Sequence, residues 1–293
     1  MMTALRPVEV EVSADQTLSW THFSHLSYDD FSRTETIQHW KLSKVFESGR
    51  YHGLYAGVLD FPKIVNRQFT LFVLGIEYTF HPDLWKVPKG MVFPFKISLE
   101  VVDMGRTSVT LFSQLVNTLD GRELATSRCK CVYTDRVTRR PVPWPQWIVH
   151  KYTPAINQKR SVDLPKAVPE VSALAYSYKV RVGASDTDIN GHTNHGSYVR
   201  YCCDAAQAAL KAGVLVLTPF HRDINRYPLK EHKIMYVGES AMGDNLQVLL
   251  WQPQGHEDTV HMVIRRKGNS DQHPVIVHGY MTFGLTPLTH PRL

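Results

Sequence analysis

The second half of the chain shows two kinds of hydrophobic periodicity. Alternation with a period of two, typical of half-buried strands, predicts strands near residues 176–182, 231–237, 245–252, 258–266 and 274–285. After the first of these strands, apolar side chains recur every three or four residues, which predicts a buried helix face. This stripe consists of Tyr198, Cys202, Ala205, Ala209 and Ala212. Thr193 or Asn194 would cap the helix at its N-terminus.

The first half repeats this order of elements. It predicts a strand near residues 20–27, a helix over about 34–49, and strands over 69–80, 93–103, 107–119 and 124–134. Ile37, Trp40 and Phe46 form the apolar side of the helix. Asp120-Gly121 is typical of a hairpin turn between the last two strands. We therefore expect an α+β protein with two similar repeats, each holding one helix and an antiparallel sheet.

A proline-rich connector separates the two repeats. Its prolines, from Pro141 to Pro169, cannot continue a helix or a central strand. A length of 293 residues suits two domains of ordinary size or one fused double domain. We therefore expect a first domain over residues 1–138, a linker over 139–170 and a second domain over 171–293.

The residues just before the second predicted helix are unusually rich in chemistry. The segment 185–195 contains two carboxylates, two carboxamides and two imidazoles. It ends where a helix begins, and the first backbone N–H groups of a helix have no intrahelical partner, so they can stabilise a developing oxyanion. This composition is typical of an active site.

The spacing inside this segment resembles a known family. Asp188-x-Asn190-x-His192-x-Asn194, followed by Tyr198, is similar to the second repeat of the plant and bacterial acyl-ACP thioesterases, and more loosely to the wider hotdog thioesterase superfamily. The resemblance implies two tandem hotdog domains, a double hotdog, in which each domain is a long helix wrapped by a strongly curved antiparallel sheet.

A second segment, 234–246, is similar to the strand of that family that carries a glutamate, then a cysteine, then a Gly/Asp turn. Glu239 stands at the glutamate position, but Ser240 takes the place of the cysteine, which argues against a covalent cysteine mechanism here. By this resemblance the functional positions fall on Asp188, Asn190, His192 and Glu239.

The resemblance implies a thioesterase that hydrolyses a fatty-acyl thioester, on acyl carrier protein or coenzyme A, to free acid and thiol. Asp188 or Glu239 would activate or position a water, Asn190 would orient a carboxylate or the substrate, and His192 would be a hydrogen-bond partner or proton carrier. The sequence leaves open which carboxylate is the base. The expected substrate-binding residues are Asn194, His195, Tyr198, Ser240 and Trp40.

The two repeats differ at this motif. Residues 34–39 occupy the equivalent place in the first repeat without reproducing Asp-x-Asn-x-His, so we expect the chemistry in the second repeat. In the resembling family the first repeat forms a wall of the acyl pocket. Trp40 is thus a candidate for chain-length selection, with core packing as the alternative.

Other interpretations of the motif stay open. Asp188 and Asn190 could serve only as a turn and helix-cap pair, and His192 as a structural histidine. Glu239 could be an exposed charge at the end of a strand. An enoyl-thioester hydratase or dehydratase has a motif resembling Asp-x-Asn-Pro-x-His, but Gly191 stands here at the proline position. A non-catalytic hotdog protein that binds acyl thioesters is the third hypothesis.

Composition narrows the remaining classes. The net charge of +6 is spread along the chain, and the basic runs are short and lack aromatic residues, so nucleic-acid binding has little support. No apolar run approaches the roughly 20 residues that span a bilayer, and the N-terminus lacks the features of a signal peptide. We expect a cytoplasmic protein, as a monomer or homodimer, with its thioester substrate as partner.

Cysteine and histidine spacing predicts no disulfide framework and no bound metal or other cofactor. The four cysteines form two close pairs, Cys129-x-Cys131 and Cys202-Cys203, which suit reduced structural thiols. The histidine pair at His192 and His195 has the spacing of metal ligands but lacks a clear third ligand.

Overall fold

The computed structural model describes residues 8–90, 92–156, 161–213, 219–267 and 274–288. The chain divides into two compact units that interleave along the sequence. Unit 1 comprises Met1–Ser27, Val45–Phe72 and Gly90–Val162, and unit 2 comprises Tyr28–Lys44, Val73–Lys89 and Asp163–Leu293. The domain limits expected from the sequence follow chain order instead, and they stay a prediction.

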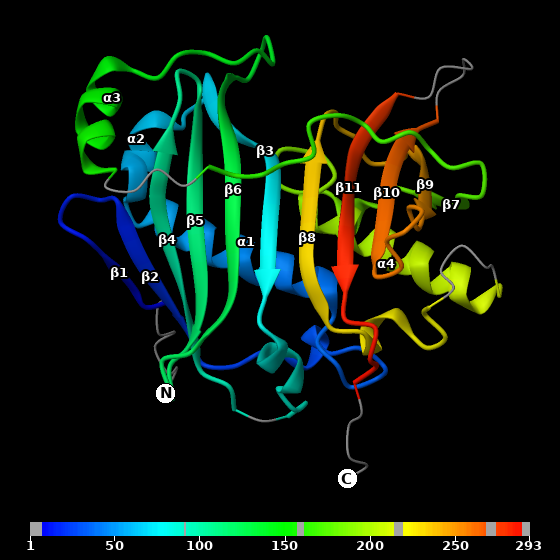
Figure 1. Ribbon diagram of the computed structural model, residues 1–293. Coiled ribbons are helices and arrows are strands. Elements are labelled where there is room, and N and C mark those ends of the chain that lie inside the picture. The colour runs from blue at the N-terminus through cyan, green and yellow to red at the C-terminus, as the bar shows by residue number, and fades with distance from the viewer. Residues whose placement is uncertain (1–7, 91, 157–160, 214–218, 268–273, 289–293) are drawn as a thin grey trace, which may run out of the picture. The chain divides into compact units, whose positions relative to one another are not determined.

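Unit 1 holds an antiparallel sheet (Figure 1). In spatial order its strands are β1 (Val10–Val12), β2 (Leu18–Phe23), β4 (Phe95–Met104), β5 (Ser108–Asn117) and β6 (Glu123–Asp135). The hairpin turn predicted between β5 and β6 is confirmed. Gly121 has a φ of +71° there, and its N–H donates to the Asn117 carbonyl at 2.9 Å.

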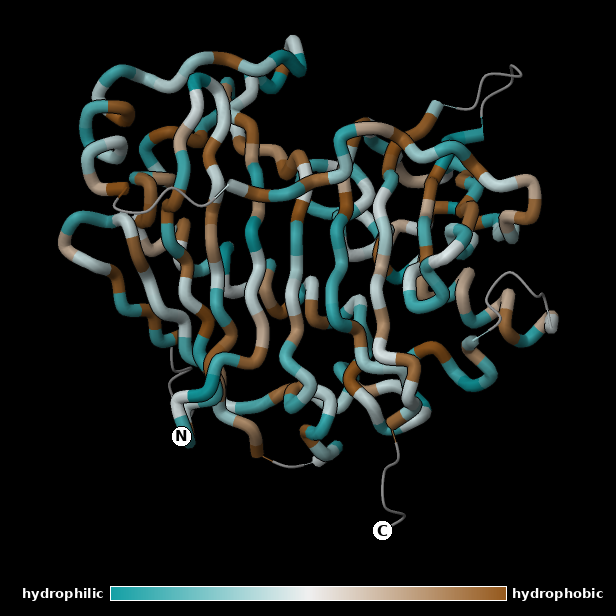
Figure 2. Tube along the Cα trace, viewed as in Figure 1, coloured by the Kyte–Doolittle hydropathy of each residue, from teal (hydrophilic) through white to brown (hydrophobic). Residues whose placement is uncertain are grey.

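Unit 2 holds a second antiparallel sheet. In spatial order its strands are β3 (Phe69–Phe80), β8 (Leu229–Tyr236), β11 (Val275–Phe283), β10 (Thr259–Arg266), β9 (Asn245–Trp251) and β7 (Tyr176–Arg181). Hydrophobic and hydrophilic residues follow one another along the strands of Figure 2, as the predicted alternation requires. The predicted strands are therefore found, each displaced by at most a few residues, and β1 is an addition.

The first predicted helix is displaced along the chain. Helix α1 runs from His39 to Tyr55, whereas the sequence pattern placed it over about residues 34–49. It begins later because Glu35 has a left-handed φ of +62°, inside a turn that precedes the helix. The helix also continues past Gly49, where the sequence pattern ended it. A Cβ atom at this position would lie 2.6 Å from Cγ2 of Ile97, so the glycine allows the helix to pack closely on the sheet and does not end it.

The second predicted helix is confirmed as α4 (His195–Lys211), which packs against β7 and β9. Asn194 is its N-cap, and the Asn194 side-chain oxygen accepts a hydrogen bond from the Gly196 N–H at 2.8 Å. The predicted apolar stripe is buried from Tyr198 to Ala209. Ala212 lies at the C-cap and is exposed, so it does not belong to the buried face.

The proline-rich connector also contains a helix that the sequence reasoning missed. Helix α3 (Gln146–Tyr152) starts directly after Pro145, where the missing proline N–H removes no helical hydrogen bond. Ile148 and Tyr152, four residues apart, are fully buried. The shorter helices are α2 (Phe61–Ile64) and the 3₁₀ turns η1 (Tyr28–Asp30), η2 (Val58–Asp60), η3 (Pro82–Lys86), η4 (Thr153–Ala155), η5 (Ala184–Asp186) and η7 (Ile224–Arg226). No helix in the described ranges has both the length and the apolar character needed to cross a membrane.

Two of the histidines buried in unit 2 pack against aromatic rings. His39 packs edge-on against Trp85, with ring centroids 5.0 Å apart, and its Nε2 lies 3.1 Å from the Tyr227 carbonyl. His232 stacks on Tyr78 at 5.9 Å. Burial lowers the pKa of His39 to about 4 and that of His232 to about 3, because the charged imidazolium is poorly solvated there.

These lowered pKa values predict acid sensitivity. In the unfolded chain His39 has its ordinary pKa of 6.5, so on acidification the unfolded state takes up the proton first and the free energy of unfolding falls between pH 6.5 and about 4. His39→Gln should flatten this dependence by up to about 1.4 kcal/mol per pH unit. Urea denaturation of both proteins across this pH range measures the difference; parallel curves would contradict the prediction.

The contact at Gly49 gives a second prediction. Gly49→Ala should lower the free energy of unfolding by about 1–3 kcal/mol, because the new methyl group collides with Ile97. Helix propensity alone predicts the opposite sign, a gain of roughly 0.5–1 kcal/mol. Ser48→Ala on the same helix is the matched control, and chemical denaturation of both variants decides between the two effects.

Candidate active site

The loop between β7 and α4 holds three of the four predicted catalytic residues. It folds back on itself through an antiparallel bridge between Thr187 and Thr193. The Asp188 N–H donates to the His192 carbonyl at 2.9 Å, and the Gly191 N–H donates to the Asp188 carbonyl at 3.0 Å. Gly191 has a φ of +76°, which glycine adopts without steric cost. We call this segment, residues 184–194, the second loop.

A loop with the same hydrogen-bond pattern precedes α1 in unit 2. This first loop, residues 28–38, is closed by a bridge between Phe31 and Ile37. The Ser32 N–H donates to the Thr36 carbonyl at 2.7 Å, and the Glu35 N–H donates to the Ser32 carbonyl at 3.0 Å. Glu35, with its positive φ, takes the place of the glycine in the second loop.

The side chains of the two loops differ completely at the predicted catalytic positions. Where the second loop has aspartate, asparagine and histidine, the first has Ser32, Thr34 and Thr36. Their three hydroxyl groups are hydrogen-bonded to one another, with oxygen–oxygen distances of 2.7, 2.8 and 2.9 Å. The same backbone thus forms without any ionisable group at these positions, so folding of the loop does not require the aspartate, asparagine and histidine.

His192 meets the fourth predicted residue on the segment that follows β8. His192 pairs with Ala241 in an isolated antiparallel bridge. Its Nε2 lies 3.3 Å from Oε2 of Glu239, and these side chains are 31% and 44% exposed. The pair is therefore within hydrogen-bonding range and open to solvent, as groups that exchange protons with a water must be.

Asp188 and Asn190 form a second polar pair in the loop. The Asn190 N–H donates to Oδ1 of Asp188 at 2.8 Å, and the Asn190 Nδ2 lies 3.4 Å from Oδ2. Asp188 is half-buried and Asn190 is exposed. The hydrogen bond from the Asn190 N–H to the side chain two residues earlier is that of an Asx turn, and the catalytic role expected of Asn190 stays a prediction.

Sequence reasoning missed Asp186, which anchors the second loop. Its side chain is buried, accepts from the Gly183 N–H at 2.9 Å and forms an ion pair with Arg200 on α4. Its carbonyl accepts from the Asn194 N–H at 2.8 Å. The backbone N–H of Asn194 therefore has a partner inside the loop. The only signal in the sequence was an aspartate three residues after a glycine, a common turn pattern.

The remaining predicted residues lie around the start of α4. The His195 ring contacts Tyr236 edge-on, with centroids 6.2 Å apart. Trp40, in the first turn of α1, is half-buried, and the Arg200 guanidinium lies 5.8 Å from its ring centroid. Tyr198 and Ser240 are almost fully buried, with exposures of 3% and 1%.

The profile of the Thioesterase-like superfamily matches residues 23–152 and 182–285. The chain belongs to the thioesterase-like superfamily. The two matched segments take in both loops and leave out most of the connector, which fits a duplicated domain.

Solved structures place this thioesterase-like protein among double hotdogs. An acyl-ACP thioesterase from Bacteroides thetaiotaomicron superposes with a TM-score of 0.70 at 15% identity, covering 93% of this chain and 100% of that chain. The 12:0-ACP thioesterase from Umbellularia californica gives 0.68 at 13% identity, covering 91% and 97%. Comparison with curated proteins gives no match. The predicted α+β fold of two tandem hotdog domains is confirmed.

The cysteines of this superfamily member are free and buried. On α4, burial raises the pKa of the Cys202 thiol well above its usual range and that of Cys203 to about 12. A thiol must ionise to act as a nucleophile. These two groups therefore stay protonated and do not supply a cysteine nucleophile near the second loop.

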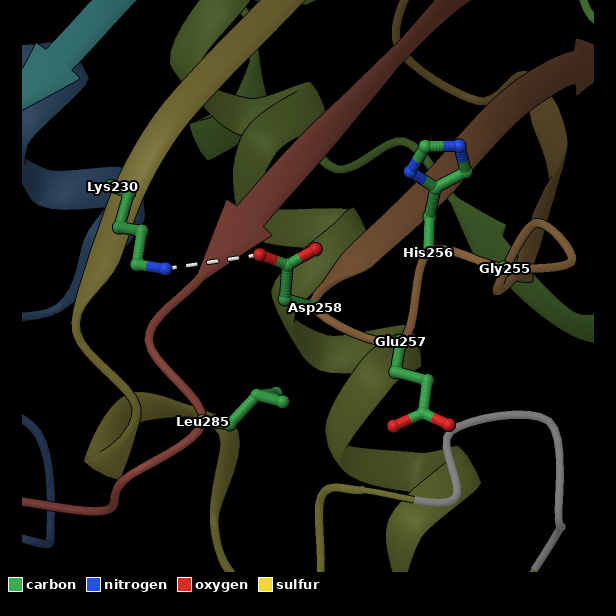
Figure 3. A pocket seen from close by; sticks show the side chains of 6 residues that line it. All are labelled: Lys230, Gly255, His256, Glu257, Asp258 and Leu285. Carbon is green, nitrogen blue, oxygen red and sulfur yellow. Dashed lines mark ion pairs between the residues drawn. The ribbon is translucent and has the colours of Figure 1, made fainter.

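A charged depression of about 530 Å³ lies elsewhere in unit 2 (Figure 3). Lys230, His256, Glu257, Asp258 and Leu285 contribute side chains to it, and Lys230 pairs with Asp258 at 3.7 Å. None of the predicted site residues lines it. Within the described ranges, no group of three or more His, Cys, Asp and Glu side chains is arranged to hold a metal ion.

The two loops provide a test of whether the motif is structural. Replacing Asp188, Asn190 and His192 by the Ser, Thr and Thr of the first loop should leave the melting temperature within about 5 °C of the original, since this backbone tolerates those side chains. Gly191→Val is the matched control, because a β-branched residue at this φ costs about 1–3 kcal/mol. Thermal unfolding followed by circular dichroism measures both; loss of folding in the triple variant would make the motif structural.

Proposed function

We propose that this protein is an acyl thioester hydrolase whose site is the second loop together with Glu239. One observation carries the proposal: the fold contains the same loop twice, and only the second copy places a carboxylate, an amide and an imidazole at the three matched positions, Asp188, Asn190 and His192. Membership of the thioesterase-like superfamily supports the reaction class. The solvent-open pair of His192 and Glu239 supports the position of the site.

In the proposed reaction, water attacks the thioester carbonyl carbon and the C–S bond breaks. His192 and Glu239 together accept the proton of the attacking water, because their side chains lie 3.3 Å apart and both reach solvent. The same proton is then returned to the leaving sulfur, so the products are a carboxylic acid and a thiol. Asp188, held by Asn190, orients the substrate or the water beside this pair.

The proposed substrate is a fatty acid esterified to the thiol of acyl carrier protein or coenzyme A. Support comes from the fold, which is shared with structures named as acyl-ACP thioesterases. The positive net charge of +6 favours an anionic handle of either kind, since both carry phosphate or carboxylate groups. Chain length and the choice of handle are left to the assay.

The decisive experiment is thiol release from acyl-CoA and acyl-ACP substrates of increasing chain length. Asp188→Asn and His192→Ala should each lower kcat/KM by at least about a hundredfold, the size expected for loss of an acid-base or orienting group. Thr34→Ala, at the position of the first loop equivalent to Asn190, is the control and should leave the rate unchanged.

Three results would contradict the proposal. Normal turnover in both variants would show that the active site lies elsewhere in the fold. Absence of thiol release from every substrate, combined with hydration of an enoyl thioester, would assign the related hydratase chemistry. Substrate binding without either reaction would leave a non-catalytic acyl-thioester-binding protein.

A further inference from the structure

Three buried hydroxyl groups meet directly behind the proposed site. Ser240 Oγ lies 2.7 Å from Thr193 Oγ1 and 2.9 Å from the Tyr198 hydroxyl oxygen. The Ser240 hydroxyl thus joins Thr193 of the second loop to Tyr198 of α4. We call this arrangement the hydroxyl triangle. Its members are 1%, 6% and 3% exposed in the order Ser240, Thr193 and Tyr198.

The backbone of Ser240 reinforces the hydroxyl triangle. The Ser240 N–H donates to the Tyr198 hydroxyl oxygen at 3.1 Å, and the Ser240 carbonyl accepts from the Thr193 N–H at 2.8 Å. Burial raises the pKa of Tyr198, which keeps its hydroxyl protonated and able to donate. Every polar group of Ser240 is thus bonded either to the second loop or to α4.

Each end of the proposed acid-base pair is the direct neighbour of a triangle member. Glu239 precedes Ser240, and His192 precedes Thr193. The separation of 3.3 Å between Glu239 and His192 therefore depends on how firmly these two segments are joined. Satisfied buried networks of this kind hold one geometry, because each broken bond leaves a buried polar group without a partner.

We infer that Ser240, with Thr193 and Tyr198, is a positioning residue that holds Glu239 against His192, and that it is neither a nucleophile nor a substrate contact. The inference rests on the proposed function for its catalytic meaning. Its structural basis is independent of that function, since the Ser240 hydroxyl is 1% exposed and bonded on two sides by other hydroxyls.

The first test is kinetic. Ser240→Ala and Tyr198→Phe should each lower kcat about five- to fiftyfold while KM changes less than about twofold, because the groups that react remain present but are misplaced. The double variant should be no slower than the slower single variant, since both substitutions break the same network. Tyr133→Phe, at a buried tyrosine of unit 1, is the matched control and should keep the original kcat.

Ser240→Cys serves as the conservative variant. Its thiol is a weak donor and acceptor, so it should recover part of the kcat lost in Ser240→Ala. Full loss of activity in Ser240→Ala, together with an acyl adduct on Ser240 in the mass spectrum of the unmodified protein, would overturn the inference and make Ser240 the nucleophile. Multiplicative losses in the double variant would overturn it as well.

The second test needs no turnover. Hydrogen exchange of the amides at positions 193 and 240 should be at least about tenfold faster in Ser240→Ala and Tyr198→Phe than in the original protein or in Tyr133→Phe, because both amides donate within this network. If the two variants exchange faster but the original protein releases no thiol, the positioning role is supported and the proposed function is rejected. If the original protein is active but the variants exchange at its rate, only the positioning role is rejected.

Discussion

The folding back of the second loop is the constraint on which the site depends. The bridge between Thr187 and Thr193 brings residues that are two and four positions apart onto one small surface. Asp188 and Asn190 can then form hydrogen bonds, and His192 can turn to the segment after β8. Without this reversal the polar side chains of the motif would be spread along an extended segment and could not act on the same substrate.

Buried polar groups have two different functions in unit 2. Asp186 and the hydroxyl triangle are bonded on all sides and fix the positions of neighbouring segments. His39 and His232 are held neutral among aromatic rings, where a proton is disfavoured. The exposed pair of His192 and Glu239 differs from both, because water reaches it and protons can enter and leave.

Local sequence patterns were enough to predict the strands, α4 with its Asn194 cap and the crowding of the second loop, since each depends on residues close together in the chain. The resemblance, not periodicity, pointed to Glu239. The displaced start of α1 depends on a non-glycine residue, Glu35, in a left-handed conformation that no local pattern announces. The hydroxyl triangle joins Thr193 to Ser240, 47 positions away, so only the tertiary structure could reveal it.

The repeated loop also bears on how such a protein changes over generations. A backbone that closes through its own N–H and carbonyl groups forms with different side chains at the three matched positions, as the serine and threonines of the first loop show. We therefore expect substitutions at these positions to change activity far more than stability. A duplicated loop of this kind lets one copy lose or acquire reactivity while the other keeps its own, so new activities can arise without an intermediate that fails to fold.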